Sequence, residues 1–257
     1  MYSRHLQAHI KLTVIHTPLP DDKKGVHLLL MNDGQDAAAL RVLKTADSLF
    51  QKKRIQPLLT VAIHPDKRTS DYGIAGYPDL GNRGNRADKY GSFIINELLP
   101  HIKKQSGVRK FNSVTLMGCS QGGLSAFDIA WNNADKIDRV GVFSGSFWWR
   151  DKKPEDPSYS DAINRITHRM VQASRKRPSL SYWFYAGTAE ETADRDKDGV
   201  IDVIDDTQDL IDLINKKNLQ LKEPVVFRKV EGGKHHTDSW ASVLPEFMIW
   251  AAGKSSQ

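Results

Sequence analysis

Short apolar runs alternate along this chain with longer amphipathic stretches, and this alternation constrains the fold more than any other feature. The runs are rich in β-branched and aromatic residues and most are closed by Gly, Pro or Asp, which is typical of buried strands. Such alternation favours an α/β fold, in which a mainly parallel central sheet has helices on both faces. We expect strands at residues 9–16, 26–31, 58–64, 113–117, 139–143, 181–186 and 224–230, and helices at 36–52, 87–104, 124–133, 206–217 and 239–252.

The composition is that of a globular domain. The chain has 257 residues, of which 39% are hydrophobic, and it shows no internal repeat and no Gly/Ser linker. We therefore expect residues 1–257 to form a single domain with a sizeable core. The net charge of +6 is too mild to indicate nucleic acid as a partner.

Three further features bound the class of protein. No stretch approaches the roughly 20 apolar residues that span a bilayer, so no membrane partner is expected. The single cysteine excludes an intrachain disulfide. The N-terminal residues lack the apolar stretch of a signal peptide, and we therefore expect a cytoplasmic location, with a mature exported form as the alternative.

A serine flanked by glycines follows the strand expected at 113–117. Residues 118–122 match the pattern G-x-S-x-G, with a strand before it and a helix-like segment after it, which is the context that a nucleophile requires. Gly118 and Gly122 have no side chains to clash in the sharp turn, so Ser120 can be held out above the sheet. The sequence therefore predicts Ser120 as a nucleophile, against the alternative of an ordinary glycine-rich turn. Cys119 is interpreted as a small buried hydrophobe.

A serine needs a base that is itself oriented by a third group, and candidates follow later strands. The strand expected at 224–230 ends in a glycine pair followed by His235 and His236; we take His235 as the base and His236 as the alternative. The strand expected at 181–186 leads to Glu190 and Glu191, either of which can orient the imidazole. Glu190 is the first choice, although the local sequence does not separate the two.

An oxyanion formed on the substrate would need backbone N–H donors. The helix after Ser120 begins at Gln121, so its free N–H groups and its dipole favour negative charge there. The loop after the strand expected at 26–31 is where a second donor arises in hydrolases of this architecture. We therefore expect the backbone N–H groups of Gln35 and Gln121 to bind the oxyanion, with a simple Asp-Gly turn as the alternative reading of the first loop.

An acidic stretch directly after the acid candidates has the spacing of a calcium-binding loop. Numbered from Asp194, carboxylates occupy positions 1, 3, 5, 9 and 12, a glycine occupies position 6, and position 7 offers a backbone carbonyl. The aspartate at position 12 departs from the usual glutamate. A solvated acidic loop is the alternative. The pattern predicts a structural Ca²⁺ with the ligands Asp194, Asp196, Asp198, Val200, Asp202 and Asp205. The serine chemistry expected at Ser120 implies no organic cofactor.

Aromatic and basic side chains also fall at the expected active edge of the sheet. Trp148 and Trp149 follow the strand expected at 139–143 and can form a wall for an aromatic acyl group, or can simply pack in the core. Arg83 lies in a glycine-containing loop and can hold an anionic substrate or form a surface ion pair.

Several motifs occur in order along most of the chain. They are residues 32–35, 71–73, 83–84 with Ala87 and Tyr90, 93–94, 97–100, 118–124, 144–149 and 232–235 with Trp240. Together these motifs resemble the putative esterase family, which includes esterase D, enterochelin (enterobactin) esterases and the mycolyltransferase antigen 85 proteins. The Ser-Gly-Ser-Phe-Trp-Trp segment is most similar to the enterochelin esterase branch.

The resemblance implies an α/β-hydrolase fold and serine carboxylesterase chemistry. It places the nucleophile at Ser120, the base at His235 and the acid at Glu190, and it supports the oxyanion role of Gln35 and Gln121. Two departures concern the substrate: we see no N-terminal extension like that of the cytosolic enterochelin esterases, and His236 stands where many relatives have Asn.

The sequence as a whole thus predicts a serine esterase that acts through an acyl-enzyme on a small-molecule or carbohydrate ester. Esters of aromatic or hydroxylated acids are expected, such as catecholate siderophore lactones or feruloyl and acetyl groups on carbohydrate. Two alternatives stay open: an acyltransferase of the same fold, and a calcium-stabilised binding module without catalysis.

Overall fold

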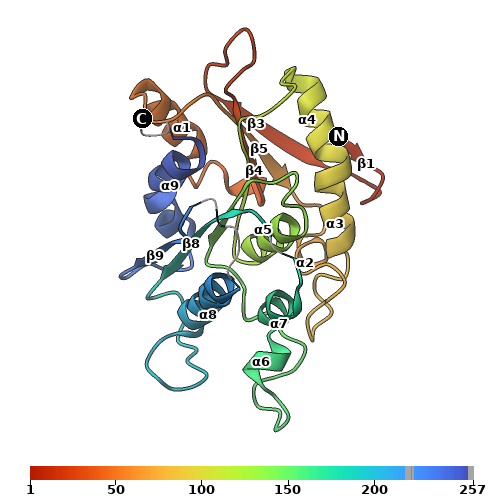
Figure 1. The fold of residues 1–257 in the computed structure, drawn as a ribbon, viewed down its shortest axis with the longest axis vertical. Coiled ribbons are helices and arrows are strands. Elements are labelled where there is room, and N and C mark those ends of the chain that lie inside the picture. Colours follow the sequence, from red (N-terminus) through yellow and green to blue (C-terminus); the bar gives the residue numbers. More distant parts are fainter. Residues whose placement is uncertain (177, 218–220, 222, 254–257) are drawn as a thin grey trace.

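A seven-stranded sheet organises the computed structural model, which describes residues 1–253 apart from 177, 218–220 and 222 (Figure 1). Its strand order is β3-β5-β4-β6-β7-β8-β9, and every neighbouring pair is parallel except the antiparallel edge pair β3–β5. The predicted mainly parallel sheet is therefore confirmed. The strands are β3 (Lys11–His16), β4 (His27–Met31), β5 (Leu58–His64), β6 (Val114–Cys119), β7 (Arg139–Phe143), β8 (Ser181–Gly187) and β9 (Val226–Val230).

Helices cover both faces of the sheet, because alternate side chains of the central strands are buried on opposite sides. On β4, Leu28 and Leu30 join a core with the helices α3 (Ala87–Phe93), α4 (Leu99–Ser106), α5 (Gln121–Asn132), α7 (Ile166–Ala173) and α8 (Asp202–Lys216). The intervening Leu29 and Met31 join a second core with α1 (Val42–Gln51) and α9 (Thr237–Ala252).

The helices α5, α8 and α9 begin two to four residues earlier than expected, and the first two expected helices differ more. The helix expected from residue 36 begins only at Val42, because a short 3₁₀ turn (η1, Gly34–Asp36) and Arg41 in the left-handed conformation (φ 58°) precede it. The helix expected at 87–104 is present but contains a π-helical turn (η2, Ile94–Leu98) between α3 and α4. The periodicity of apolar residues did not reveal the short elements β1 (Tyr2–Ser3), β2 (Ala8–His9), α2 (Arg68–Asp71), α6 (Asp161–Asn164) or α7.

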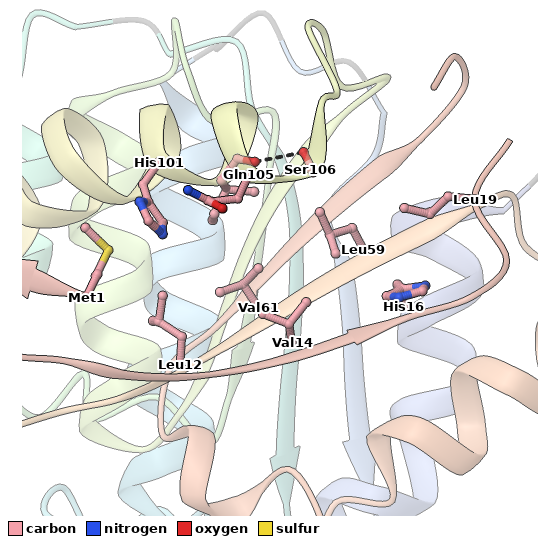
Figure 2. Close-up of a pocket in the computed structure, with 11 residues that line it drawn as sticks. Met1, Leu12, Val14, His16, Leu19, Leu59, Val61, His101, Gln105 and Ser106 are labelled. Atoms are coloured by element: carbon pink, nitrogen blue, oxygen red, sulfur yellow. Dashed lines mark hydrogen bonds between the residues drawn. The ribbon is translucent and has the colours of Figure 1, made fainter. Parts of the chain in front are cut away.

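A groove of about 620 Å³ lies between the edge strand β3 and helix α4 (Figure 2). Its floor is apolar, with Leu12 and Val14 from β3 and Leu59 and Val61 from β5. None of the candidate catalytic residues lines it. Within the described ranges, no helix is long and apolar enough to cross a membrane.

Candidate active site

Five loops that follow parallel strands meet at the same edge of the sheet, where α/β proteins build their sites. Gln35 follows β4, Ser120 follows β6, Ser144 follows β7, Glu190 follows β8 and His235 follows β9. The structure thus brings the three members of the predicted triad and the first oxyanion candidate to one edge. Ser144 is an addition that the sequence analysis gave no role.

Ser120 occupies a strained turn between β6 and α5. Its backbone angles are φ 56° and ψ −127°, a conformation that residues other than glycine rarely adopt. The turn is closed by a 2.8 Å hydrogen bond from the Ser120 N–H to the Phe143 carbonyl oxygen. A Cβ at Gly118 would collide with the Gly122 carbonyl, and a Cβ at Gly122 would lie 2.7 Å from the Asp33 carboxylate. Both glycines are therefore needed for the close approach, and Ser120 is left half-buried at the surface.

Two backbone N–H groups near Ser120 are unoccupied donors. Among the described residues, neither the Gln121 N–H at the start of α5 nor the Gln35 N–H has a hydrogen-bond acceptor. The Gln121 side chain points elsewhere, because its amide donates to the carbonyl oxygens of Thr69 and Tyr72 at 3.1 and 2.8 Å. Free N–H groups beside a nucleophile are the arrangement that stabilises a developing oxyanion.

Buried polar side chains hold the Gln35 loop against the Ser120 turn. Asn32 donates to the Gly122 carbonyl at 2.8 Å and accepts from the Tyr90 hydroxyl at 2.6 Å. The Asp33 N–H, in the left-handed conformation, donates to the Tyr72 hydroxyl at 3.0 Å. Burial raises the pKa of both tyrosines, so their hydroxyls stay neutral. These contacts fix the two candidate oxyanion donors relative to one another.

The Asp33 carboxylate is neutralised by a residue that the sequence analysis did not single out. Arg68 pairs with it through two hydrogen bonds of 2.7 and 3.0 Å and lies over the Tyr72 ring. A bidentate pair of this kind is among the stronger polar contacts in proteins. The negative charge of Asp33 beside the oxyanion loop is therefore compensated.

His235 is hydrogen-bonded to Glu190 and not to Glu191. Its Nδ1 lies 2.9 Å from Glu190 Oε2, and the Glu190 side chain is 1% exposed whereas the imidazole is 41% exposed. Since an ionised carboxylate only accepts, Nδ1 carries the hydrogen and Nε2 is left as the free acceptor. Glu191 instead accepts from the Val203 N–H at the start of α8, and His236 is exposed and caps α9.

The Ser120 hydroxyl has a neighbour from the turn after β7. Ser120 Oγ lies 3.5 Å from Ser146 Oγ, and the Ser146 side chain is buried. Across the described part of the chain, no hydrogen bond joins Ser120 Oγ to His235. Contacts between a nucleophile and its base are often long without substrate and shorten in the substrate complex.

The two tryptophans considered for substrate contact differ in exposure. Trp149 is fully buried and donates from its indole N–H to the Tyr77 carbonyl oxygen at 3.1 Å, so its position is that of a packing residue. Trp148 is half-buried and lies beneath the Arg83 guanidinium, 4.8 Å from its ring centroid. Arg83 also pairs with the buried Asp79. Of the two indoles, only that of Trp148 presents surface to a ligand in this structure.

A mostly apolar cavity of about 870 Å³ opens beside the oxyanion loop. Gly34 and Gln35 line it from that loop, His64 lines it from the end of β5, and Val42 and Leu43 line it from α1. Of the candidate site residues, Gln35 lines this cavity, whereas Ser120, Glu190 and His235 do not.

Three aspartates of the acidic loop converge. The carboxylate oxygens of Asp194, Asp196 and Asp198 lie within 4.8 Å of one another. Asp194 accepts from the N–H groups of Asp198 and Gly199 at 3.2 and 3.0 Å, and Asp198 accepts from the Val200 N–H at 2.8 Å. Across the described residues, no cationic side chain pairs with any of these three carboxylates. Oxygen ligands in this spacing suit a hard divalent cation.

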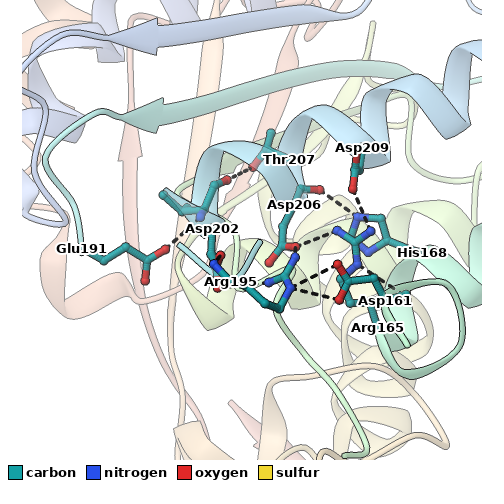
Figure 3. Close-up of polar contacts among 10 residues, drawn as sticks. Asp161, Arg165, His168, Glu191, Arg195, Asp202, Asp206, Thr207 and Asp209 are labelled. Atoms are coloured by element: carbon teal, nitrogen blue, oxygen red, sulfur yellow. Dashed lines mark hydrogen bonds and ion pairs between the residues drawn. The ribbon is translucent and has the colours of Figure 1, made fainter. Parts of the chain in front are cut away.

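The last two predicted carboxylate ligands are placed differently. Burial, followed by the charges of Asp198 and Asp196, raises the pKa of Asp205 to about 6, so Asp205 lies within the field of the cluster. Asp202 is engaged by Arg195 instead: its carboxylate accepts from the Arg195 backbone N–H at 2.8 Å and pairs with the guanidinium at 3.0 Å (Figure 3). The sequence pattern did not anticipate this arginine, which lies inside the loop itself.

Arg195 connects the acidic loop to neighbouring elements. Its guanidinium pairs with Asp206 on α8 and with Asp161 on α6, each at 3.0 Å (Figure 3). Arg165 completes the network through Asp206 and Asp209, both at 2.7 Å. The network ties the loop to α6 and α8 through ion pairs that do not involve the three converging carboxylates.

Comparison with known proteins places the chain in a family. The family described as "Putative esterase" matches residues 3–251, and the chain belongs to it. A Bacillus subtilis (strain 168) protein, the uncharacterised YbbA, is 25% identical over 155 residues, which cover 58% of this chain and 62% of that protein.

Solved structures define the fold of this family member. The enterobactin esterase of Shigella flexneri superimposes with a TM-score of 0.74 at 19% identity, over 98% of this chain and 57% of that one. A ferulic acid esterase gives 0.66 at 18% identity, over 98% and 95% of the two chains. The fold is an α/β-hydrolase fold. The chain spans less than two thirds of the length of YbbA and of the Shigella enzyme.

Proposed function

We propose that this protein is a serine carboxylesterase that works through an acyl-enzyme. Ser120 attacks the ester carbonyl, His235 Nε2 takes the serine proton and then gives it to the leaving alcohol, and water releases the acyl group in the reverse sequence. Glu190 holds the imidazole in the tautomer with hydrogen on Nδ1 and stabilises its cationic form. The observation that carries this proposal is the 2.9 Å bond between His235 Nδ1 and Glu190 Oε2 at the edge that holds Ser120.

The negative charge that develops on the carbonyl oxygen is assigned to the Gln35 and Gln121 N–H groups. Their freedom from other acceptors supports this role, because a donor already engaged would have to break a bond first. The bonds from Asn32 to Gly122 and from Asp33 to Tyr72 hold the two donors in place before substrate arrives.

For the substrate, we propose an ester of an aromatic or hydroxylated acid. The half-buried Trp148 indole and the apolar cavity lined by Gln35 support an aromatic group. The Shigella relative acts on enterobactin and the other solved relative on ferulic acid esters, which supports the same class. The natural ester is best sought with a panel of siderophore lactones and of feruloyl and acetyl esters.

Hydrolysis of a short p-nitrophenyl ester tests the proposed activity. Wild type should release p-nitrophenol, and Ser120→Ala should lose at least about a thousandfold in kcat/KM, because no other residue replaces the nucleophile. Ser181→Ala, which removes a buried hydroxyl elsewhere on the sheet, is the matched control. Absence of any Ser120-dependent release would favour the binding module, and transfer to an added alcohol would favour the acyltransferase.

We further propose that Asp194, Asp196 and Asp198 bind a structural Ca²⁺, with the Val200 carbonyl and Asp205 completing the ligands. Their convergence without a cationic partner and the raised pKa of Asp205 support this proposal. Asp202 remains a ligand only if it leaves Arg195 or acts through water.

The cation would stabilise the loop that carries Glu190. The loop is closed at its base by the bond from the Val203 N–H to Glu191 and by the bond from the Asp202 N–H to the Ala193 carbonyl, both 2.8 Å. Exhaustive chelation should therefore lower both the melting temperature and the turnover number, and added Ca²⁺ should restore both. Unchanged turnover and an unchanged melting temperature after chelation would rule out this role.

A further inference from the structure

The buried serine at the end of β7 lies between the candidate acid and a tryptophan of α9. Ser144 Oγ is 2.6 Å from Glu190 Oε1 and 2.7 Å from Trp240 Nε1. Ser144 is 1% exposed and Trp240 is 7% exposed, so water does not compete for these bonds. The Gly187 N–H also donates to Glu190 Oε1, at 2.6 Å. Three groups therefore surround one carboxylate: two donors on Oε1 and the imidazole on Oε2.

The direction of these hydrogen bonds follows from the chemistry of the groups. An indole N–H can only donate, so the Ser144 oxygen must accept from Trp240. Its own hydrogen is then directed to Glu190, because an ionised carboxylate offers only acceptors. Trp240 therefore donates to Ser144, and Ser144 donates to Glu190. Both hydrogen bonds run in the same direction, so each strengthens the other.

The backbone of Ser144 is held in an uncommon conformation that keeps its hydroxyl at this point. Its φ is 51°, where a glycine would be less strained, and its N–H donates to the Tyr185 carbonyl oxygen at 2.8 Å. Trp240 also touches the base directly, since its ring meets that of His235 edge-to-face at 5.2 Å. Ser144 and Trp240 thus contact the acid and the base while lying outside the reacting atoms.

We propose that Ser144, oriented by Trp240, is a positioning residue that sets the charge and orientation of Glu190 and thereby the basicity of His235. This inference rests on the proposed esterase function. A donor to Oε1 disperses the negative charge of the carboxylate and leaves Oε2 aimed at Nδ1. Without that donor the charge is less dispersed, so it binds the His235 proton more strongly and the imidazole becomes neutral only at higher pH.

The Glu190 charge also acts on the pKa of neighbouring titratable groups. Burial raises the pKa of Tyr185 on β8 and of Cys119 on β6, and the Glu190 charge raises both further, so both stay neutral near pH 7. Burial is also the main cause of the raised pKa of Glu191. A change in the His235 titration in a Ser144 variant is therefore attributable to Glu190 when these residues are left intact.

The test compares Ser144→Ala, Ser144→Gly and Trp240→Phe with wild type. In each, the acid limb of the kcat/KM pH profile and the His235 Nδ1–H proton resonance are measured. Both Ser144 variants should shift the limb upward by about half a pH unit and lower kcat roughly tenfold. Trp240→Phe keeps the ring contact and should give a smaller shift in the same direction. Ser144→Gly relieves the backbone strain, so an equal shift in Ala and Gly identifies the hydroxyl as the cause.

Matched controls use groups of the same kind that lack partners. Ser181 Oγ and Trp183 Nε1 are buried and have no hydrogen-bond partner among the described residues, so Ser181→Ala and Trp183→Phe should leave the limb unmoved. Melting temperatures of all variants separate loss of folding from loss of positioning.

The inference would be overturned if the acid limb of the kcat/KM pH profile and the His235 Nδ1–H resonance were both unchanged in the two Ser144 variants, whatever their melting temperatures. A Trp240→Phe shift larger than that of Ser144→Ala would do the same, because the indole N–H acts on Glu190 only through the serine. The resonance is read without substrate, so this outcome is distinct from failure of the esterase proposal, which would show as Ser120-independent hydrolysis.

Discussion

The loop after β8 carries carboxylates in two contrasting states. Glu190 is buried, with a 1% exposed side chain, and is surrounded by donors from Ser144, Gly187 and His235. Only a few residues further on, Asp194, Asp196 and Asp198 converge with just backbone N–H groups as donors and with no cationic partner in the described ranges. The Glu190 carboxylate receives hydrogen bonds from the protein on both oxygens. The three aspartates concentrate negative charge that no cationic side chain of the described residues balances.

This contrast separates two ways of using a negative charge. A buried carboxylate is retained only when hydrogen bonds replace the water it loses, and it can then orient a neighbour such as His235. Carboxylates that repel one another at the surface raise the free energy of the folded loop, and a bound cation converts that repulsion into attraction. We expect the first arrangement to serve the proposed chemistry, and the second to give a stability that depends on the proposed ion.

The largest expected effect comes from removing the charge of Glu190 alone. Glu190→Gln keeps the size of the side chain but allows the amide to donate to His235, which favours the wrong tautomer of the imidazole. We expect kcat/KM to fall by about 10³ to 10⁴ with little change in melting temperature. Steady-state kinetics with a p-nitrophenyl ester measure this loss.

Glu191→Gln is the matched control for that experiment. Glu191 is adjacent in sequence but accepts from the Val203 N–H and does not contact His235. Its substitution should change kcat/KM by less than about threefold. A loss as large as that of Glu190→Gln would show that the choice between the two glutamates is wrong.

The second effect concerns the three converging aspartates and acts on stability. At a Ca²⁺ concentration about a hundredfold above its Kd, the cation should stabilise wild type by roughly 2.7 kcal/mol, or about 5–10 °C in melting temperature. Asp198→Asn should lose most of that gain, and in chelator it should be no less stable than wild type because a repulsion is removed. Asp135→Asn, in an exposed pair with Lys136, is the control that should keep the full gain. An equal Ca²⁺ response in Asp198→Asn would dismiss the site.

Sequence patterns were sufficient to predict those parts of the structure that depend on neighbouring residues in the chain. The strands before Ser120, Glu190 and His235 could be predicted because buried strands are rich in β-branched and aromatic residues. Since all three follow parallel strands, their meeting at one edge of the sheet followed from topology. The aspartate spacing likewise predicted a convergence that the structure shows for Asp194, Asp196 and Asp198.

What the sequence left open depends on partners that are distant in the chain. Glu190 and Glu191 are equivalent locally, and only the position of His235, 45 residues away, separates them. The Ser144–Trp240 bond joins residues 96 positions apart, so no spacing rule reveals it. Both residues lie in segments that carry the family resemblance, which was the available signal. Arg195, inside the loop, draws Asp202 away from the cluster through contacts that a pattern of acids cannot show.

The smallest expected effect is a pH dependence of stability that arises from Asp205. Burial and the neighbouring charges of Asp198 and Asp196 raise its pKa from 3.8 to about 6, so between these values the folded protein holds a proton that the unfolded chain has released. In chelator, this group's contribution to stability is complete below about pH 4 and is lost as the pH rises through 6. Because the side chain is partly exposed, screening keeps the effect below about 1 kcal/mol. In chelator, denaturant unfolding at pH 4.5 and pH 7 should show a smaller decrease in stability for Asp205→Asn than for wild type. Saturating Ca²⁺ should offset the decrease of wild type at pH 7, because the cation binds the ionised carboxylate in place of the proton. Identical profiles for Asp205→Asn and wild type in chelator would mean that the loop does not concentrate charge at Asp205, and the contrast with Glu190 would then rest on the three converging aspartates alone.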